Sequence, residues 1–241
     1  MNTSLTSAQL KSISKGQLLG RYGNAISAEV LAGSLIGTAL VICLFISDQS
    51  TVAGLVITWL ITLLISILAG IFHVGLTRFY LNLVCNRPYR ANDVFCGFLS
   101  HADRAIAVRF LLLLIRLLCL TPFFICEFLY DNKSDTAVMY LICCVTLAAG
   151  MAVWIWFSLV YAQVYYVMLD FPNYSVKQIM SVSRRIMKGH KGRLFYINVT
   201  LIPYYISSFL SCGIAFLWVI PFRRTLLTNF YLDIMHREYT V

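Results

Sequence analysis

Charged side chains lie inside long apolar runs of this sequence, where they could bind an ion or pair with one another. They are Glu29, Arg109, Arg116, Glu127, Arg223 and Arg224. Arg116 lies 12 residues beyond Arg104, which is about 18 Å along a helix. A charge at the centre of a lone membrane helix costs at least about 2.5–3.5 kcal/mol, so the side chain should face a helix bundle or water.

Arg109 precedes Arg116 by one heptad and therefore lies near the same face of a helix. Glu127, 11 residues past Arg116, returns to that face. Glu29 lies about 12 Å beyond Arg21, at a depth between those of the two arginines. We expect Arg116 to pair with an acidic group, and Glu29 is the first candidate. This set of charged residues indicates either a polar lumen or anion-binding site, or a set of structural ion pairs.

A second cluster of charge surrounds the motif Met187-Lys-Gly-His-Lys191 and is followed by Arg193. The stretch before it has apolar residues that can share one side of a helix, and Gly189 is a favourable residue to end that helix. One interpretation is a contact with anionic lipid headgroups or a cytoplasmic partner. The other is an anchor that only fixes the orientation in the membrane. The proposed contact residues are Lys188, His190, Lys191 and Arg193.

Patterns typical of enzymes and metal sites are missing from the sequence. There is no H-E-x-x-H, no G-x-S-x-G and no phosphate-binding glycine loop. The four histidines lack ligand spacing, and none of the eight cysteines forms a C-x-x-C pair. We therefore expect no catalytic residues, no metal and no cofactor. The net charge of +9 falls between apolar runs, so membrane topology explains it better than nucleic-acid binding does.

The elements that carry these residues are expected to be membrane helices. The chain is 60% hydrophobic and 12% charged, whereas soluble domains are about 45–50% apolar and about 25% charged. Several apolar runs reach the length of about 20 residues that spans a bilayer. The sequence predicts an all-α, polytopic transmembrane helical bundle with about six spans. The runs are 25–46, 52–73 with a helical pattern extending towards 83, 105–129, 137–168, 194–210 and 214–234.

The distribution of lysine and arginine predicts the orientation. The segments before residue 25, from 78 to 104 and from 170 to 193 hold 3, 4 and 6 of them, and the two alternate connections hold none and one. The basic side should therefore face the cytoplasm, with both termini there and external turns at 47–51 and 131–135. The last hairpin should be kinked at Pro221 or partly re-entrant, because Arg223 and Arg224 lie deep in it.

This pattern divides the chain into three parts. Residues 1–24 form a cytoplasmic amphipathic segment, either a helix on the inner membrane surface or a flexible tail. Residues 25–236 form a single transmembrane helical domain with cytoplasmic basic loops at 77–104 and 170–193, and residues 237–241 form a tail. In the first span, the Gly33-x-x-x-Gly37 pattern would allow a neighbouring backbone to approach closely.

Several segments, in order along nearly the whole chain, resemble one known family. They are 10–26, Gly75-Leu-Thr-Arg-Phe79, Phe95-Cys-Gly-Phe98, 183–191 with Leu194-Phe195, 213–222 and Asn229-Phe-Tyr231. The family is DUF975, uncharacterised bacterial, chiefly Firmicute, integral membrane proteins. The resemblance implies a multi-pass protein of the cytoplasmic membrane and brings no established activity. The sequence departs from the family pattern at Phe222, usually tyrosine, and at Leu201-Ile-Pro203, where a Gly-Trp pair is expected.

Two classes of function are favoured over a third, an intramembrane enzyme. The first is a non-enzymatic accessory or envelope-homeostasis factor, which would contact the lipid bilayer and a membrane-protein partner. The second is a small transporter or channel with a polar path lined by Arg109, Arg116 and Glu29. A wide cavity that reaches Arg116 would favour the transporter, and a closed, dry bundle would favour the accessory factor.

Overall fold

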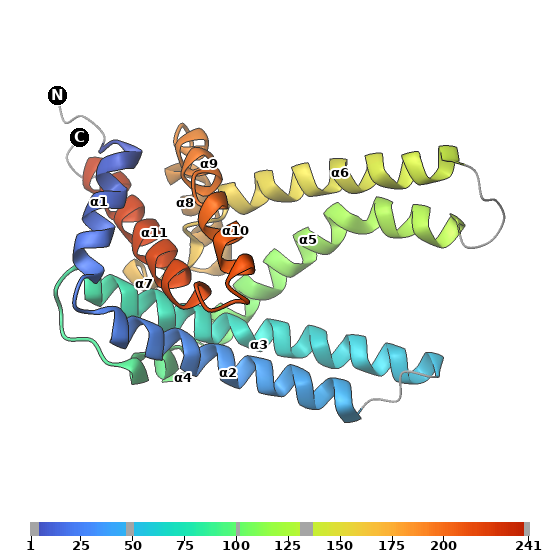
Figure 1. Cartoon of the computed structure of the whole chain (residues 1–241), viewed down its shortest axis with the longest axis horizontal. Helices are drawn as coiled ribbons and strands as arrows, with labels where there is room; N and C mark the ends of the chain where they lie inside the picture. Colours follow the sequence, from blue (N-terminus) through green and yellow to red (C-terminus); the bar gives the residue numbers. More distant parts are fainter. Residues whose placement is uncertain (1–4, 47–50, 100–101, 131–136, 239–241) are drawn as a thin grey trace.

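The computed structural model describes residues 5–46, 51–99, 102–130 and 137–238, and within these ranges the chain forms helices and no strands. Two long helical hairpins project from a cap of shorter helices (Figure 1). In the described residues, four helices are long and apolar enough to cross a membrane. They are α2 (Tyr22–Ile46), α3 (Val52–Val84), α5 (Ala102–Tyr130) and α6 (Ala137–Val160).

The sequence pattern predicted the long helices well. α3 has 33 residues, about 50 Å of helix, and its extension beyond residue 73 confirms the prolonged apolar pattern. α5 continues through Pro122 without ending. The expected external turns, 47–51 and 131–135, fall outside the described residues except for Thr51. The Thr51 hydroxyl accepts a hydrogen bond from the Gly54 amide (3.1 Å) and caps α3.

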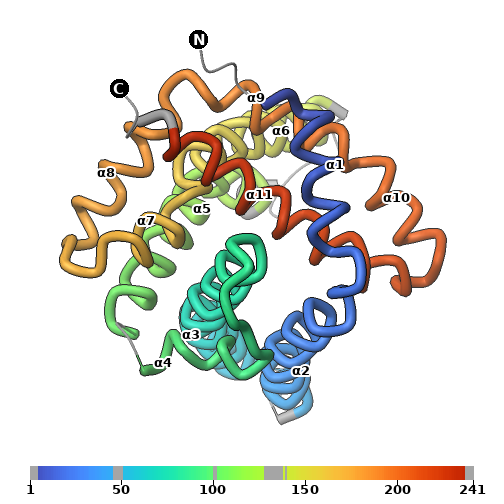
Figure 2. The backbone as a smooth tube through the Cα atoms, turned by 90° about the vertical axis from the view of Figure 1, so that its left-hand side faces the viewer, coloured from blue at the N-terminus to red at the C-terminus, as the bar shows by residue number. Residues whose placement is uncertain are grey.

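The cap consists of α11 (Phe216–Glu238) and of shorter helices from both ends and from the middle of the chain. α11 crosses between the α2–α3 pair and the α5–α6 pair when the molecule is viewed from the cap (Figure 2), so its side chains can reach both hairpins. The remaining helices are α1 (Ser7–Leu18), α4 (Cys96–Leu99), α7 (Val164–Asp170), α8 (Val176–Ile186), α9 (Lys191–Val199), α10 (Ile202–Leu210) and α11 (Phe216–Glu238), with a 3₁₀ turn η1 (Ala91–Phe95).

The N-terminal segment is a helix that packs on α11. Thr6 caps it in a capping box with Gln9. The Asn229 side-chain amide of α11 donates hydrogen bonds to Ser14 Oγ (2.9 Å) and Gln17 Oε1 (2.7 Å). The fully buried Leu10 belongs to the main core. Of the two forms expected for this segment, the structure therefore has the helix, with its apolar side against protein.

The two segments expected as basic loops are largely helical. The first, 77–104, contains the end of α3, η1, α4 and the start of α5, and the second, 170–193, contains α8. η1 and α4 pack tightly on α3 through two glycines. A Cβ on Gly75 would collide with the Val94 backbone, and a Cβ on Gly97 would collide with the Ile71 carbonyl. These contacts explain two of the segments that the family resemblance singles out.

The Gly33-x-x-x-Gly37 pattern does not serve a close helix contact within the described chain. A Cβ added at either glycine would meet nothing within 4 Å. The expected close approach of a neighbouring backbone is therefore wrong for this chain by itself.

The region 194–234 differs from the expected pair of spans. α9 and α10 have nine residues each, far fewer than the roughly 20 that cross a bilayer. The turn between α10 and α11 places Gly213 at φ +90°, which glycine adopts without strain. Phe216, just after this turn, lines the same cavity as Ile36 of α2. The predicted turn near Gly213 is thus confirmed, and the hairpin reaches only partway along α2.

Candidate functional site

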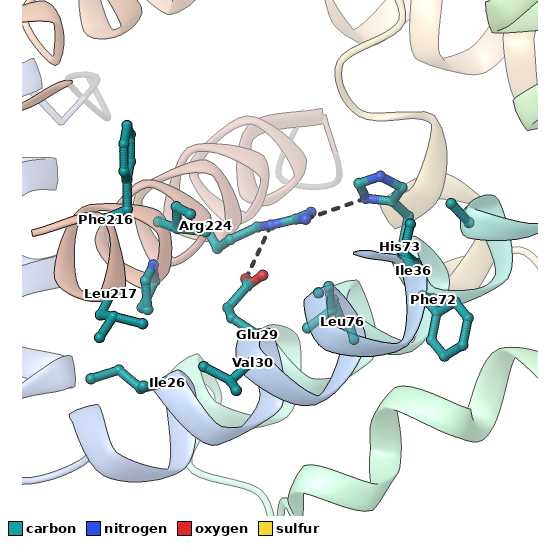
Figure 3. Close-up of a pocket in the computed structure, with 15 residues that line it drawn as sticks. Ile26, Glu29, Val30, Ile36, Phe72, His73, Leu76, Phe216, Leu217 and Arg224 are labelled. Carbon is teal, nitrogen blue, oxygen red and sulfur yellow. Dashed lines mark hydrogen bonds and ion pairs between the residues drawn. The ribbon is translucent and has the colours of Figure 1, made fainter. Parts of the chain in front are cut away.

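Arg224 of α11 links α2 and α3, the two helices of the first long hairpin. Its Nε lies 3.3 Å from Glu29 Oε1 of α2, and its Nη2 lies 3.3 Å from His73 Nδ1 of α3 (Figure 3). The side chains of Arg224 and Glu29 are only 21% and 15% exposed. They border an otherwise mainly apolar cavity of about 260 Å³ between α2, α3 and α11. Among the described residues, Glu29 is the only carboxylate that lines this cavity, and the ion pair neutralises it.

The expected pairing of Glu29 with Arg116 is wrong. The two residues were matched by their depth along separate helices, and that comparison carried no information about which helices are neighbours. In the structure α11 lies against both α2 and α3, so Arg224 reaches Glu29, whereas Arg116 lies over Trp154 of α6. Arg224 lines the cavity beside Glu29, whereas Arg223 does not.

A second cavity, of about 270 Å³, brings four of the predicted intramembrane charges together. We call it the arginine cavity, after the side chains of Arg109, Arg116, Arg223 and Arg224 that line it. Two come from α5 and two from α11. The other lining residues in the described part of the chain are mostly apolar or aromatic, and none of them is Asp or Glu. A wide cavity that reaches Arg116 is the feature expected of a transporter, and this cavity of about 270 Å³ does reach Arg116.

The arginines of this cavity are held largely by neutral groups. Arg109 Nε donates a hydrogen bond to the Ser66 carbonyl (3.1 Å). The exposed Arg116 lies over the Trp154 ring, 5.1 Å from its centroid. Such a cation–π contact leaves the guanidinium donors available for another ligand. Within the described residues, the ion pairs are Arg224–Glu29 and Arg193–Asp233. Four positive charges at the cavity are therefore offset by one nearby carboxylate.

Neutral polar groups complete the wall of the arginine cavity. The His73 ring stacks on Tyr165, with 5.7 Å between centroids. The buried Tyr165 hydroxyl lies near Arg109. His73, Tyr165 and Trp154 were not predicted as site residues, because the histidines lack the spacing of metal ligands and no motif marks the two aromatic side chains. The contact between α3 and α7 that joins His73 to Tyr165 left no sequence signal.

Glu127 is not part of either site. It is exposed near the far end of α5 and lines neither cavity. Its helical phase with Arg116 did not bring the two side chains together, since 11 residues separate them by about 16 Å along the helix.

The Arg193 side chain lies in the interior of the cap and is paired there. Its Nη1 lies 2.6 Å from Asp233 Oδ2, with side-chain exposures of 15% and 9%. Its Nη2 donates to the Leu5 carbonyl, and its guanidinium lies over Phe230. It therefore ties α9 to α11 and to the chain before α1. This internal role replaces the expected headgroup contact for Arg193.

The rest of the basic motif lies nearer the surface. Lys191 Nζ lies 4.2 Å from the centroid of Trp156, whose side chain is largely exposed. Lys188 is exposed and His190 is half-buried. The motif contains a turn in which Gly189 has φ +88°. Helix α8 ends just before it at Ile186, which confirms the predicted helix end near this residue.

α8 is amphipathic, as predicted, but its apolar side faces the protein. Ile179, Ile186 and Met187 are buried in the main core. The opposite side carries exposed basic residues, so this surface is free to meet a charged partner. They are Lys177, Arg184, Arg185 and Lys188.

Comparison with known proteins gives a family and no further relatives. Neither the curated proteins nor the solved structures contain a match to this chain. Residues 1–238 match the model of a family described as "Protein of unknown function (DUF975)". The match includes both long hairpins, the arginine cavity and the cap. It agrees with the family predicted from the sequence, and the chain belongs to the DUF975 family.

Proposed function

We propose that this is a non-enzymatic, multi-pass protein of the bacterial cytoplasmic membrane that binds an anion in the arginine cavity, as the binding step of a small transporter or channel. The single observation that carries the proposal is the convergence of Arg109, Arg116, Arg223 and Arg224 on one cavity that no carboxylate lines. Guanidinium groups present several donors in a planar fork that matches carboxylate and phosphate oxygens. An anion would offset their mutual repulsion.

In the proposed topology α2, α3, α5 and α6 cross the membrane, and the α10–α11 hairpin enters it partway from the cytoplasmic side. Two observations support this arrangement. The cap carries the basic segments, which favour the cytoplasm. Lys191 and Trp156 meet where α6 joins the cap, and such residue types gather at membrane interfaces. The arginine cavity would then lie within the cytoplasmic half of the membrane.

Cysteine labelling tests this topology. In a variant without native cysteines, Ser134→Cys should react with an impermeant maleimide in intact cells, whereas Lys188→Cys should react only after the cells are opened. The reason is that residue 134 lies between two proposed spans and Lys188 is exposed on the cap. Labelling of Lys188→Cys in intact cells would contradict a cytoplasmic cap, and protection of Ser134→Cys would contradict the outward crossing of α5.

Anion binding can be tested with a pair of charge-matched double variants. Arg116→Gln with Arg223→Gln removes two positive charges from the arginine cavity. Arg184→Gln with Arg185→Gln removes two exposed charges from α8. The probes are inorganic phosphate and phosphatidylglycerol, added to full-length protein in neutral phosphatidylcholine nanodiscs. A hydrogen bond to a charged group contributes about 1.5–3 kcal/mol, so the cavity variant should bind at least one probe about tenfold more weakly.

The α8 variant should bind these probes like the unmodified protein in buffer of moderate ionic strength. Equal losses in the two variants would mean that the probes respond to net charge alone, and the proposal would fail. It would also fail if neither probe bound to the unmodified protein.

An accessory factor remains the second candidate because of the exposed basic side of α8, which lies outside both cavities. That surface would suit an acidic cytoplasmic partner or the inner-leaflet headgroups expected at Lys188, His190 and Lys191. If the α8 variant abolished the cellular function while anion binding in the arginine cavity was intact, this second function would be favoured.

A further inference from the structure

We infer that the ligand of the arginine cavity is an anionic amphiphile, with its headgroup among the arginines and an acyl chain in an apolar groove between α5 and α6. The inference rests on the proposed anion-binding function and names the class of its ligand. The structural basis is a continuous path from a basic site to an apolar one.

The apolar groove has a volume of about 470 Å³ and is lined by α5 and α6. It shares two lining residues, Ile115 and Phe157, with the arginine cavity. Arg116 immediately follows Ile115 on α5. The two hollows therefore adjoin along the same pair of helices, and a ligand in one can extend into the other.

The lining of the groove suits hydrocarbon. Most of its side chains are apolar, and Thr146 is the only lining residue with a hydroxyl. That hydroxyl is already used, since it donates to the Ile142 and Cys143 carbonyls of its own helix (3.0 Å each). A soluble anion would find no polar partner here, whereas an acyl chain needs none.

Close helix packing fixes the shape of this groove. A Cβ on Gly150 of α6 would come within 2.6 Å of the Cys119 carbonyl oxygen of α5. The glycine thus lets the two backbones approach beside the groove. Ala149, next to it, lines the groove and is exposed. The groove therefore lies beside a close approach of the α5 and α6 backbones.

The order of the residues also fits a lipid. From Arg116 to Pro122, α5 runs away from the cap for six residues, about 9 Å. A headgroup at Arg116 and Arg223 would place its acyl chain along this stretch, towards the middle of the proposed membrane. This is the direction in which a lipid of the cytoplasmic leaflet would lie, so such a lipid could enter sideways between its neighbours.

Two neighbouring alanines on α6 allow a matched test. Ala149→Trp should fill the groove, whereas Ala148→Trp adds the same side chain at an exposed position that does not line it. Binding of phosphatidic acid and of its soluble counterpart glycerol 3-phosphate is measured with full-length protein in phosphatidylcholine nanodiscs. The unmodified protein should prefer phosphatidic acid by at least about tenfold.

We expect Ala149→Trp to remove most of that preference and Ala148→Trp to keep it, with glycerol 3-phosphate or inorganic phosphate bound equally by both. Ala149→Leu, a smaller change, should give an intermediate result and guards against a fold defect of the tryptophan variant. Equal affinity for the lipid and its soluble counterpart would overturn the amphiphile and leave anion binding intact. If the double variant Arg116→Gln with Arg223→Gln still preferred phosphatidic acid, the lipid would be bound only as annular lipid around the helices. That result would overturn the inferred amphiphile as well. If no anionic probe binds, the proposed function itself fails.

Discussion

Replacing Arg224 with leucine should destabilise the protein by about 3–5 kcal/mol, because the change leaves a buried carboxylate without its partner. Glu29 is 15% exposed and lies 3.3 Å from the Arg224 guanidinium. The same substitution removes the contact with His73. Unfolding of purified protein by a denaturing detergent, followed by circular dichroism, measures the loss.

A double change isolates the pair. Glu29→Gln with Arg224→Leu should be more stable than Arg224→Leu alone, since no charge then stays buried unpaired. Arg116→Leu provides the matched control, because its guanidinium packs on Trp154 and does not reach Glu29. Combining it with Glu29→Gln should give simply additive losses. The structure would be contradicted if the losses of stability were additive for Glu29 and Arg224 but coupled for Glu29 and Arg116. That result would restore the pairing of Glu29 with Arg116 that was expected from depth alone.

Gly75→Val should destabilise the protein by about 3 kcal/mol or more, at the upper end of the cost of overpacking. The reason is that a Cβ on Gly75 collides with the backbone of Val94, which a side-chain rotation cannot relieve. Loss of this contact should separate η1 from α3. The expected result is a lower yield of folded protein and a lower midpoint in detergent unfolding.

Gly37→Ala is the control for helix propensity. Its added methyl group meets nothing within 4 Å, so the substitution should be neutral or slightly stabilising in a helix. A Gly75 variant as stable as the unmodified protein would mean that η1 does not rest on α3 as described.

Features encoded by local periodicity were predictable from the sequence. The long apolar helices, the buried face of α8 with Ile179 and Ile186, and the turns at Gly189 and Gly213 all follow from patterns within about 20 residues. Each depends on local backbone preferences or on the burial of one face of a helix. The two hairpins of α2–α3 and α5–α6 follow from the same reasoning, since short connections make successive helices neighbours.

The features of the structure that could not be predicted depend on packing between segments that are far apart in the sequence. Nothing local indicates that α11 lies between the hairpins, so Glu29 was matched to Arg116 when its partner is Arg224. Arg193 belongs to a strongly basic segment, and its ion pair with Asp233 arises only from the packing of α9 on α11. The nine-residue helices α9 and α10 were taken for one span because hydropathy registers their apolar content and not the break between them.

The candidate site was predictable in its residues and not in its arrangement. Arg109 and Arg116 share a helical face, which the heptad spacing gives directly. Arg223 and Arg224 were expected to be deep, but their convergence with α5 on one cavity depends on the path of α11. The adjoining apolar groove is formed where Gly150 lets α6 approach α5, and no residue type marks it in the sequence.

Locating a heavy anion in crystals of the full-length protein would test the central claim most directly. Selenate has a phosphate-like shape and an anomalous signal that identifies its position. We predict a selenate peak in the arginine cavity, within hydrogen-bond distance of Arg116 or Arg223, that disappears in the Arg116→Gln and Arg223→Gln double variant. Selenate peaks confined to the exposed basic side of α8, with none in the arginine cavity, would contradict the account.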